Sequence, residues 1–325
     1  MEKNIAVIGC GYWGSNLIRN FYELGVLNSV CDDNQSLAKS KAKEYAVRNL
    51  ELSQILDDKN IKGVVIAAPA FLHSELSIKC MKAGKHVFVE KPIALDLTEA
   101  REMQSVSVSQ KKHLMIGHLL QYHPVFVRLK KIVSEGLLGN VNYIRSNRLS
   151  LGKIRSEEDV LWSFAPHDIS MILSLVDSNP KSILNQSAII NQENIADLSS
   201  VYIDFENKTK ANINVSWFNP FKEHKLIVLG DKKMAVFDDT QPWESKLSIL
   251  DFNLTKNLGE IGLQKKGSKF ISIEEKEPLK EECNHFVEVV NRNIRPRTDS
   301  QEGIRVLEIL QKASESSKKE KKIFF

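Results

Sequence analysis

The chain has little of several features that define specialised classes of protein. Only four of its 325 residues are cysteines (Cys10, Cys31, Cys80 and Cys283), and they form no CxxC pair. Such wide spacing argues against a disulfide framework and against a structural zinc site. No apolar run approaches the roughly 18 residues that a transmembrane helix needs, and the N-terminus lacks the layout of a signal peptide. We therefore expect a cytoplasmic protein with no metal and no membrane contact.

An excess of charge of one sign is also missing. The 45 basic and 41 acidic residues leave a formal net charge of +4, which is too mild to predict binding to nucleic acid. One dense basic cluster, at residues 318–322, is typical of a solvated helix end. Hydrophobic residues make up 42% of the chain, as in ordinary globular proteins. A length of 325 residues favours two domains.

Strand and helix patterns alternate in the first part of the chain. Strand-like runs occupy residues 4–11, 27–34, 63–69, 86–92 and 113–120. Helical periodicity occupies residues 15–25, 36–46, 72–84 and 97–110. This alternation is typical of βαβ units with a parallel sheet. It predicts an α/β domain over residues 1–121.

The pattern changes after residue 121. Helical periodicity marks residues 123–136, 160–176, 281–293 and 301–314. Strand-like runs lie at residues 141–151, 200–205, 210–218, 225–230, 233–239 and 246–252. Short loops join several of these runs, which favours antiparallel hairpins. We predict an α+β domain over residues 122–325, built on one large, mainly antiparallel sheet. An exposed sheet face needs a cover, so we expect a homodimer or homotetramer through this sheet.

Residues 9–14, GCGYWG, follow a strand pattern and precede a helix pattern. Gly9 permits a tight turn, Gly11 lets the backbone approach a pyrophosphate, and Gly14 lets helix and strand pack closely. Asp32 closes the second strand and is placed to bind an adenosine ribose. Asp33 follows it and no arginine does, which argues against a 2′-phosphate. The pattern predicts a Rossmann site for NAD.

Other residues at the same sheet edge are candidate neighbours of the cofactor. Tyr12 and Trp13 lie inside the glycine loop, where they either wall the cofactor cleft or only pack the first helix. The segment AAPAFLH ends the third strand of the α/β domain, where ligands of open α/β sheets bind. Its candidates are Ala68, Pro69, Leu72 and His73. His73 has an equally good interpretation as a helix-cap histidine.

The tripeptide Glu90-Lys91-Pro92 ends the fourth strand, at the edge that carries the glycine loop. A lysine there would reach a substrate hydroxyl and take its proton as hydride leaves the carbon. Desolvation and a positive nicotinamide ring would favour the neutral amine. Glu90 would pair with a local cation or bind a cofactor or backbone group, and Pro92 is a candidate for a cis peptide. A surface salt bridge explains the tripeptide equally well.

Several motifs together resemble one enzyme family. GCGYWG, AAPAFLH, AGKHVFVEKPIAL and APHDI are similar to segments of glucose–fructose oxidoreductase, inositol dehydrogenase and their relatives. The resemblance covers essentially the whole chain and implies that Lys91 is catalytic. The family's D-x-G-x-H signature implies a catalytic role for His167, which lies beside Asp168. Ser163 stands where the family has aspartate, and a hydroxyl cannot act as a base near neutral pH.

Further segments resemble the nucleotide-sugar branch of this family. These are GYWGSNLIRNFYELG, RLSLGKIRSEEDVLW and SWFNPFKEHKLIVLGDKKMAVFDD. Members of that branch oxidise the 3-hydroxyl of UDP-N-acetylglucosamine or its uronate before an aminotransferase acts. Basic side chains suit a UDP diphosphate, although a solvated edge strand would show the same charges. The predicted substrate-binding residues are Lys91, Tyr122, Arg148, Lys153, Arg155, Ser163, His167 and Asp168.

The leading hypothesis is thus an NAD-dependent UDP-sugar 3-dehydrogenase for surface-glycan synthesis. One alternative is a dehydrogenase of a free sugar or inositol. Another is a non-catalytic binder of NAD or nucleotide sugar, which is motivated by Ser163.

Overall fold

The computed structural model describes residues 2–152, 154–156, 158–191, 193–257 and 260–325. The chain forms two compact units. Unit 1 comprises Met1–Tyr122 and Lys276–Glu308, and unit 2 comprises His123–Glu275 and Ile309–Phe325. The chain therefore passes between the units three times, where the sequence suggested a single division.

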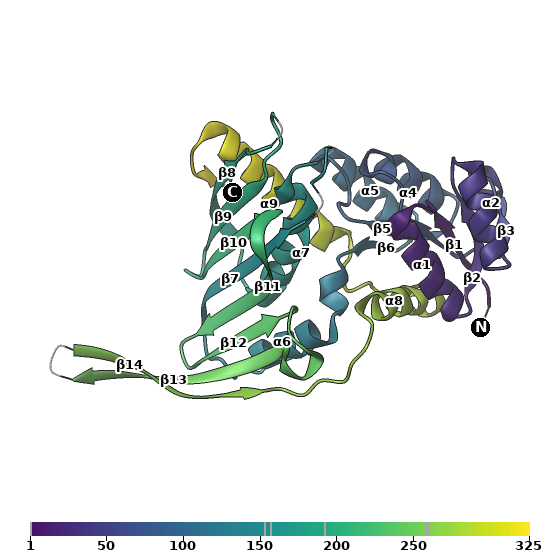
Figure 1. The fold of residues 1–325 in the computed structure, drawn as a ribbon. Coiled ribbons are helices and arrows are strands. Elements are labelled where there is room, and N and C mark those ends of the chain that lie inside the picture. The colour runs from purple at the N-terminus through teal and green to yellow at the C-terminus, as the bar shows by residue number, and fades with distance from the viewer. Residues whose placement is uncertain (1, 153, 157, 192, 258–259) are drawn as a thin grey trace. The chain divides into compact units, whose positions relative to one another are not determined.

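Unit 1 is built on a parallel sheet with the strand order β3-β2-β1-β4-β5-β6. The strands are β1 (Ile5–Ile8), β2 (Leu27–Cys31), β3 (Arg48–Asn49), β4 (Gly63–Ile66), β5 (His86–Glu90) and β6 (Leu114–Gly117). The continuous apolar runs of β1 and β4 are wholly buried, as expected for strands covered on both faces. Cys10 is buried just after β1, and Cys31 is buried at the end of β2. The predicted Rossmann arrangement is confirmed (Figure 1).

The helices of unit 1 connect the strands of this sheet. They are α1 (Tyr12–Glu23), α2 (Gln35–Glu44), α3 (Leu52–Asp57), α4 (His73–Lys82) and α5 (Leu97–Ser109), with short turns η1 (Ala70–Leu72) and η2 (Leu119–Tyr122). Side-chain caps fix where two of them begin. Asn34 accepts from Leu37 N at 3.2 Å, and Asp96 accepts from Glu99 N at 2.9 Å. These starts follow the strand ends directly, so the helix N-termini lie at the carboxyl edge of the sheet.

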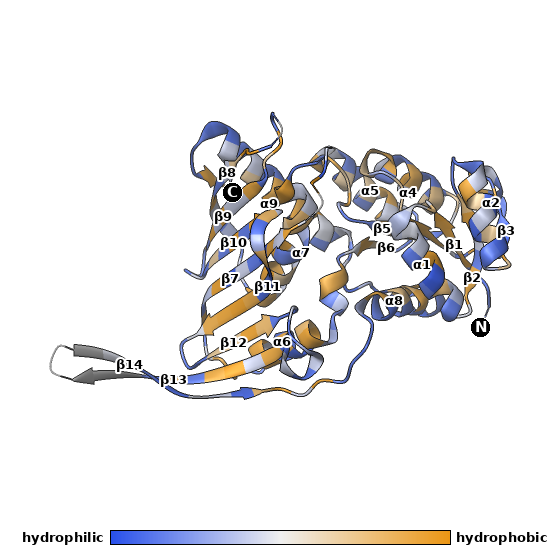
Figure 2. Cartoon of the chain, viewed as in Figure 1, coloured by the Kyte–Doolittle hydropathy of each residue, from blue (hydrophilic) through white to orange (hydrophobic). Residues whose placement is uncertain are grey.

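Helix α8 (Pro278–Arg292) packs on the sheet of unit 1, although the sequence suggested that it belongs to the second domain. Its residue Phe286 is fully buried and contacts Phe21 of α1 and Phe88 of β5, with ring centroids 6.2 and 5.6 Å apart in edge geometry. In Figure 2 hydrophobic and hydrophilic residues alternate along α8, as in a helix with one buried face. The last long helix, α9 (Ser300–Lys319), begins in unit 1.

Unit 2 is built on a sheet with the order β14-β13-β12-β11-β7-β10-β9-β8-β15. Its strands are β7 (Val141–Leu151), β8 (Pro180–Ala188), β9 (Leu198–Phe205), β10 (Lys210–Ser216), β11 (Phe218–Gly230), β12 (Lys233–Asp238), β13 (Leu247–Asn257), β14 (Glu260–Phe270) and β15 (Ile323–Phe324). Among the described strands of this second sheet, β7 and β10 form the only parallel pair. The prediction of a mainly antiparallel sheet is confirmed, whereas β8, β14 and β15 were not foreseen.

Two faces of this sheet differ in character. Helix α7 (Val160–Leu175) packs on β7, β9 and β10, where Ile144 and Ile213 are fully buried. Asn147 and Asn214 alternate with those residues and lie on the opposite face. There Asn214 donates to Asn147 at 2.9 Å, and Asn147 donates to Glu223 of β11 at 2.8 Å. The face away from α7 thus carries a polar ladder. The remaining elements of the unit are α6 (Pro124–Ser134) and the turn η3 (Trp243–Ser245).

Among the residues that the structure describes, no helix combines the length and the apolar character needed to cross a membrane.

The contacts of Phe286 predict that α8 is required for the stability of unit 1. Replacing this fully buried ring by alanine should lower the free energy of unfolding by about 3–5 kcal/mol, because a cavity opens between α1, α8 and β5. Chemical denaturation measures the change. Phe71→Ala in the same unit is the matched control, since Phe71 is 65% exposed and its loss should cost about 0.5 kcal/mol or less. Equal midpoints for the two variants would contradict the packing of α8.

Candidate functional site

Two glycines of the loop after β1 are tightly packed, and the third has open space around it. Gly9 has a φ of 96°, and a Cβ there would lie 2.5 Å from Ala67 O. A Cβ on Gly14 would lie 2.0 Å from Gly9 O. A Cβ on Gly11 would meet nothing within 4 Å. Gly9 and Gly14 are thus required by packing, whereas Gly11 faces open space at the N-terminus of α1. Such a cradle fits the pyrophosphate of a dinucleotide.

Asp32, at the end of β2, is tied to the backbone of the glycine loop. Its Oδ2 accepts from Cys10 N at 2.6 Å, and its Oδ1 accepts from Asn34 N at 2.8 Å. The carboxylate therefore fixes the loop as well as standing where a ribose would bind. Each oxygen has a second lone pair for a hydroxyl donor. Asp33 is exposed beside it. Both ribose roles stay predictions.

His73 connects the loops that follow β4 and β5. Its Nδ1 lies 2.7 Å from Pro92 O and its Nε2 lies 2.9 Å from Ala68 O. Burial lowers the pKa of His73, although both backbone contacts oppose that shift. Pro69 is exposed and Leu72 is half-buried at the same edge. The structure therefore gives His73 a structural role between two loops that flank the predicted cofactor.

A hydrogen bond joins the glycine loop to the end of β5. Trp13 Nε1 donates to Glu90 Oε1 at 2.6 Å, and Lys91 N donates to Glu90 Oε2 at 3.3 Å. Trp13 therefore does more than pack against α1, whereas Tyr12 is 90% exposed. The Lys91–Pro92 peptide is cis, the form for which Pro92 was a candidate. Burial raises the pKa of Glu90 to about 7, against the lowering effects of Trp13 and Lys91.

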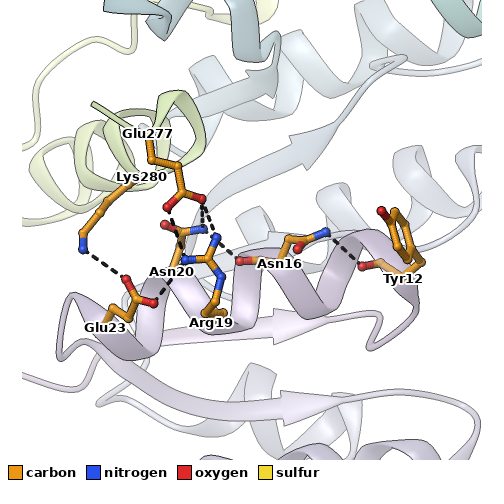
Figure 3. A network of polar contacts seen from close by, with 7 residues as sticks. All are labelled: Tyr12, Asn16, Arg19, Asn20, Glu23, Glu277 and Lys280. Carbon is orange, nitrogen blue, oxygen red and sulfur yellow. Dashed lines mark hydrogen bonds and ion pairs between the residues drawn. The ribbon is translucent and has the colours of Figure 1, made fainter. Parts of the chain in front are cut away.

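Polar side chains tie α1 to the start of α8 (Figure 3). Arg19 lies between Glu23, at 3.1 Å, and Glu277, with which it forms two hydrogen bonds. Lys280 donates to Glu23 at 3.0 Å, and Asn20 donates to Glu277 at 3.3 Å. Arg19 and Lys280 lower the pKa of Glu23, so the carboxylate stays charged. The network fixes the helix that carries the glycine loop.

In unit 2, α7 presents Ser163 and His167 one turn apart, so both lie on one face of the helix. Ser163 is buried and His167 is half-buried. The neighbouring Asp168 is 1% exposed and accepts from Ser146 Oγ at 2.6 Å and from Arg148 Nε at 2.7 Å. A second bond from Arg148 Nη2, at 3.2 Å, makes this ion pair bidentate. Asp168 thus anchors β7 to α7, and a direct contact with substrate stays a prediction.

The basic residues predicted for the substrate have different surroundings. Arg148 is held by Asp168, and it pairs across the sheet with His224 of β11. Burial, together with the charge of Arg148, lowers the pKa of His224 to about 4. Arg155 is half-exposed and forms an ion pair with Glu158 at 2.7 Å. Lys153 lies outside the described residues.

Tyr122 is buried in unit 1 instead of lying at a binding surface. It is 2% exposed, its hydroxyl lies 3.0 Å from Thr298 Oγ1, and the guanidinium of Arg297 stacks over its ring at 4.7 Å. Burial raises the pKa of Tyr122. Because the hydroxyl is engaged inside the unit, the predicted contact of Tyr122 with substrate has no support from this placement.

Two features of unit 1 escaped the sequence analysis. The Trp13–Glu90 hydrogen bond joins residues 77 positions apart. Glu282 of α8 is 0% exposed, and neither of its oxygens has a hydrogen-bond partner among the described residues. A charged residue in a helical pattern is normally assigned to the solvent face, so no sequence signal marked Glu282. The described residues contain no group of three or more His, Cys, Asp or Glu side chains that could hold a metal ion.

Two family models match the chain. Residues 3–118 match the model described as the oxidoreductase family with an NAD-binding Rossmann fold. Residues 126–236 match the model described as the GFO/IDH/MocA C-terminal domain. The two matches together cover most of the chain: the first includes the whole sheet of unit 1, and the second includes β7 to β11 and part of β12 in unit 2.

Curated relatives and solved structures agree with these matches. The UDP-N-acetylglucosamine 3-dehydrogenase of Acidithiobacillus ferrooxidans is 25% identical over 257 residues, which covers 78% of this chain and 75% of the relative. Its solved structure has a TM-score of 0.85 at 21% identity and covers 97% of this chain and 98% of that one. The myo-inositol 2-dehydrogenase of Thermotoga maritima is 24% identical over 61% of this chain and 62% of its own length. GenD2 from gentamicin A biosynthesis, solved in complex with NAD, has a TM-score of 0.84 at 19% identity and covers 100% of this chain and 97% of that one.

The glycine loop generates a prediction that separates binding from folding. Gly11→Ala should leave the melting temperature without ligand unchanged, because the added methyl meets nothing within 4 Å. It should weaken NAD binding about tenfold or more, or about 1.4 kcal/mol, because the methyl occupies the space where the pyrophosphate approaches the backbone. Calorimetric titration with NAD measures the affinity. Gly267→Ala on β14, which is equally open, is the control. Unchanged affinity in Gly11→Ala would contradict the site.

Proposed function

Since the chain belongs to the GFO/IDH/MocA oxidoreductase family and its cofactor is NAD, we propose that it oxidises the 3-hydroxyl of a UDP-N-acetylhexosamine or of the corresponding uronate. The product would be a 3-keto sugar nucleotide, which suits a following aminotransferase in surface-glycan synthesis.

The observation that carries this proposal is the position of Lys91. It is the first residue after β5, at the carboxyl edge of the parallel sheet, and it is half-buried. The glycine loop reaches the same place through the hydrogen bond between Trp13 and Glu90. Ligands of open α/β sheets bind beyond this edge. An amine there is suited to receive the proton of a substrate hydroxyl.

Bound NAD supplies the hydride acceptor. In the proposed reaction the C3–H bond breaks as hydride leaves, the C3–O bond becomes a carbonyl, and the hydroxyl proton passes to Lys91. His167 is the second residue for which the family resemblance implies a role in the reaction, and Ser163 lies one turn away from it on α7. Asp168 has a positioning role, because the hydrogen bonds that it accepts from Ser146 and Arg148 hold α7 against β7.

The nucleotide-sugar class is supported by the relative that acts on UDP-N-acetylglucosamine, which aligns over most of both chains. Arg155 stays a predicted diphosphate ligand, and its 48% exposure leaves the guanidinium accessible although it pairs with the partly exposed Glu158. Arg148 is less available, because Asp168 already accepts two of its hydrogen bonds.

Oxidation of a free cyclitol is a second candidate, and the similarity to myo-inositol 2-dehydrogenase favours it. A cyclitol lacks a diphosphate and would not need Arg155. A third candidate is a non-catalytic binder of NAD or nucleotide sugar. It is motivated by Ser163, which stands where the family signature has aspartate.

We also propose a homo-oligomer through the sheet of unit 2. The ladder of Asn214, Asn147 and Glu223 lies on the face away from α7, where these polar groups remain accessible to a second copy.

The substrate class is tested by following NADH absorbance with purified protein and NAD. UDP-N-acetylglucosamine, its uronate and myo-inositol are compared, with a UDP-sugar aminotransferase and glutamate present to remove the ketone. We expect a signal with one UDP-sugar and none with myo-inositol. A signal with myo-inositol alone would replace the proposal by the cyclitol reaction.

Lys91→Ala should reduce turnover about 10²–10⁴-fold, the usual contribution of one general acid–base group, while NAD affinity changes little. Lys82→Ala, at the exposed end of α4, is the control and should keep full turnover. Full turnover in Lys91→Ala would disprove the role of Lys91.

Ser163→Asp introduces the carboxylate that relatives carry. If serine weakens only orientation, this variant should raise turnover severalfold with unchanged NAD affinity. Turnover that appears only in Ser163→Asp would identify the natural protein as a non-catalytic binder.

A further inference from the structure

The carboxyl groups of Glu90 and Glu282 are neighbours inside unit 1. Phe88 and Glu90 lie on the same side of β5, and Phe286 follows Glu282 by one turn of α8. The rings of Phe88 and Phe286 are in edge contact at 5.6 Å. This contact brings Glu282 toward Glu90, and the two carboxyls interact electrostatically.

Glu90 and Glu282 differ in what surrounds them. Glu282 is wholly buried with no partner for either oxygen in the described part of the chain. Glu90 is partly exposed, accepts from Trp13 Nε1 and Lys91 N, and lies over Gly117 of β6, where a Cβ would come within 2.8 Å of Oε2. Ionisation of both of two neighbouring carboxyls in a buried site is strongly disfavoured. Glu282 therefore keeps its proton, and Glu90 is the member that exchanges a proton with solvent.

The side chains around Glu90 and Glu282 do not supply enough positive charge for both carboxyls to ionise. Lys91 and His118 face Glu90 from the ends of β5 and β6, and His118 is itself bound to Glu302 at 2.6 Å. On the other side Tyr122 and Cys283 adjoin Glu282. Burial raises the pKa of both Glu282 and Glu90, and that of Glu90 to about 7. Glu90 is thus half-protonated near neutral pH in the free protein.

Glu90 ends β5, in the half of the sheet over which the nicotinamide half of the cofactor is expected to bind. In a Rossmann sheet the adenosine half lies over the first strands, here marked by Asp32 on β2, and the nicotinamide half lies over the second mononucleotide unit, which includes β5. The oxidised nicotinamide ring carries a positive charge and the reduced ring is neutral. A carboxyl at this place therefore meets a different charge in each redox state.

We propose that Glu90 matches its charge to the redox state of the cofactor: it is ionised when NAD⁺ is bound and protonated when NADH is bound. Binding of NAD⁺ to the protonated form releases the proton of Glu90 to solvent, whereas binding of NADH to the ionised form takes a proton up from solvent. Glu282 stays neutral throughout, because it is wholly buried and neither of its oxygens has a hydrogen-bond partner in the described part of the chain. This inference concerns the cofactor alone and does not depend on which sugar is oxidised.

The test measures NAD⁺ and NADH affinities between pH 6 and pH 8 without any sugar. Because Glu90 must lose a proton as NAD⁺ binds, the NAD⁺ dissociation constant should fall roughly tenfold as pH rises through this range. The NADH dissociation constant should rise instead, because Glu90 must be protonated in that complex. Calorimetry in buffers of different ionisation enthalpy should detect the release of roughly half a proton or more per NAD⁺ at pH 6.5, and proton uptake per NADH at the upper end of the range.

Two isosteric variants identify which of the two carboxyls exchanges the proton. Glu90→Gln should abolish the pH dependence and the proton release while still binding both cofactor forms. Glu282→Gln should retain both, because a neutral amide replaces a neutral acid. A pH dependence that survives Glu90→Gln, or one that is lost only in Glu282→Gln, would overturn the assignment. Parallel slopes for NAD⁺ and NADH in the natural protein would also overturn it.

Discussion

The close approach of α1 to β1 is the constraint on which the rest of unit 1 depends. A Cβ at Gly14 would lie 2.0 Å from the carbonyl oxygen of Gly9, so helix and strand meet at a distance that only glycine allows. This approach leaves the amide of Cys10 free to bond Asp32 and leaves the Gly11 backbone open. It also directs Trp13 toward the end of β5. One packing constraint therefore prepares both the phosphate cradle and the link to Glu90.

The parallel arrangement of the strands brings the residues of the candidate site together at one edge of the sheet. Because all strands of unit 1 run in one direction, their carboxyl ends share an edge, and residues 32, 68 and 90 gather there from separate βα units. Helix α8 then adds a contribution from much later in the chain. The contacts of Phe286 with Phe21 and Phe88 fix its depth and rotation. Glu282 is buried as a consequence, one turn before that aromatic anchor.

Unit 2 follows a different principle, in which a buried ion pair sets the geometry. Asp168 would be costly to bury alone, and the bidentate bond from Arg148 with the hydroxyl of Ser146 compensates for the lost water. The same pair fixes the rotation of α7, and with it the face that carries Ser163 and His167. A residue predicted to touch substrate thus has a clear positioning role. Its partner Arg148, predicted to bind phosphate, is largely used for the same purpose.

The sequence by itself determined the parallel sheet, the mainly antiparallel sheet, the glycine loop and the family. These depend on local periodicity and short spacing, which any stretch of sequence displays. It also indicated Lys91, because a charged residue directly after a buried strand is unusual. Only the tertiary structure decided the membership of α8 in unit 1, the burial of Tyr122, the pairing of Asp168 with Arg148 and the opposition of Glu90 and Glu282. These features join residues from 20 positions apart (Arg148 and Asp168) to about 265 positions apart (Phe21 and Phe286). Their partners are selected by packing between elements, which local sequence patterns do not encode.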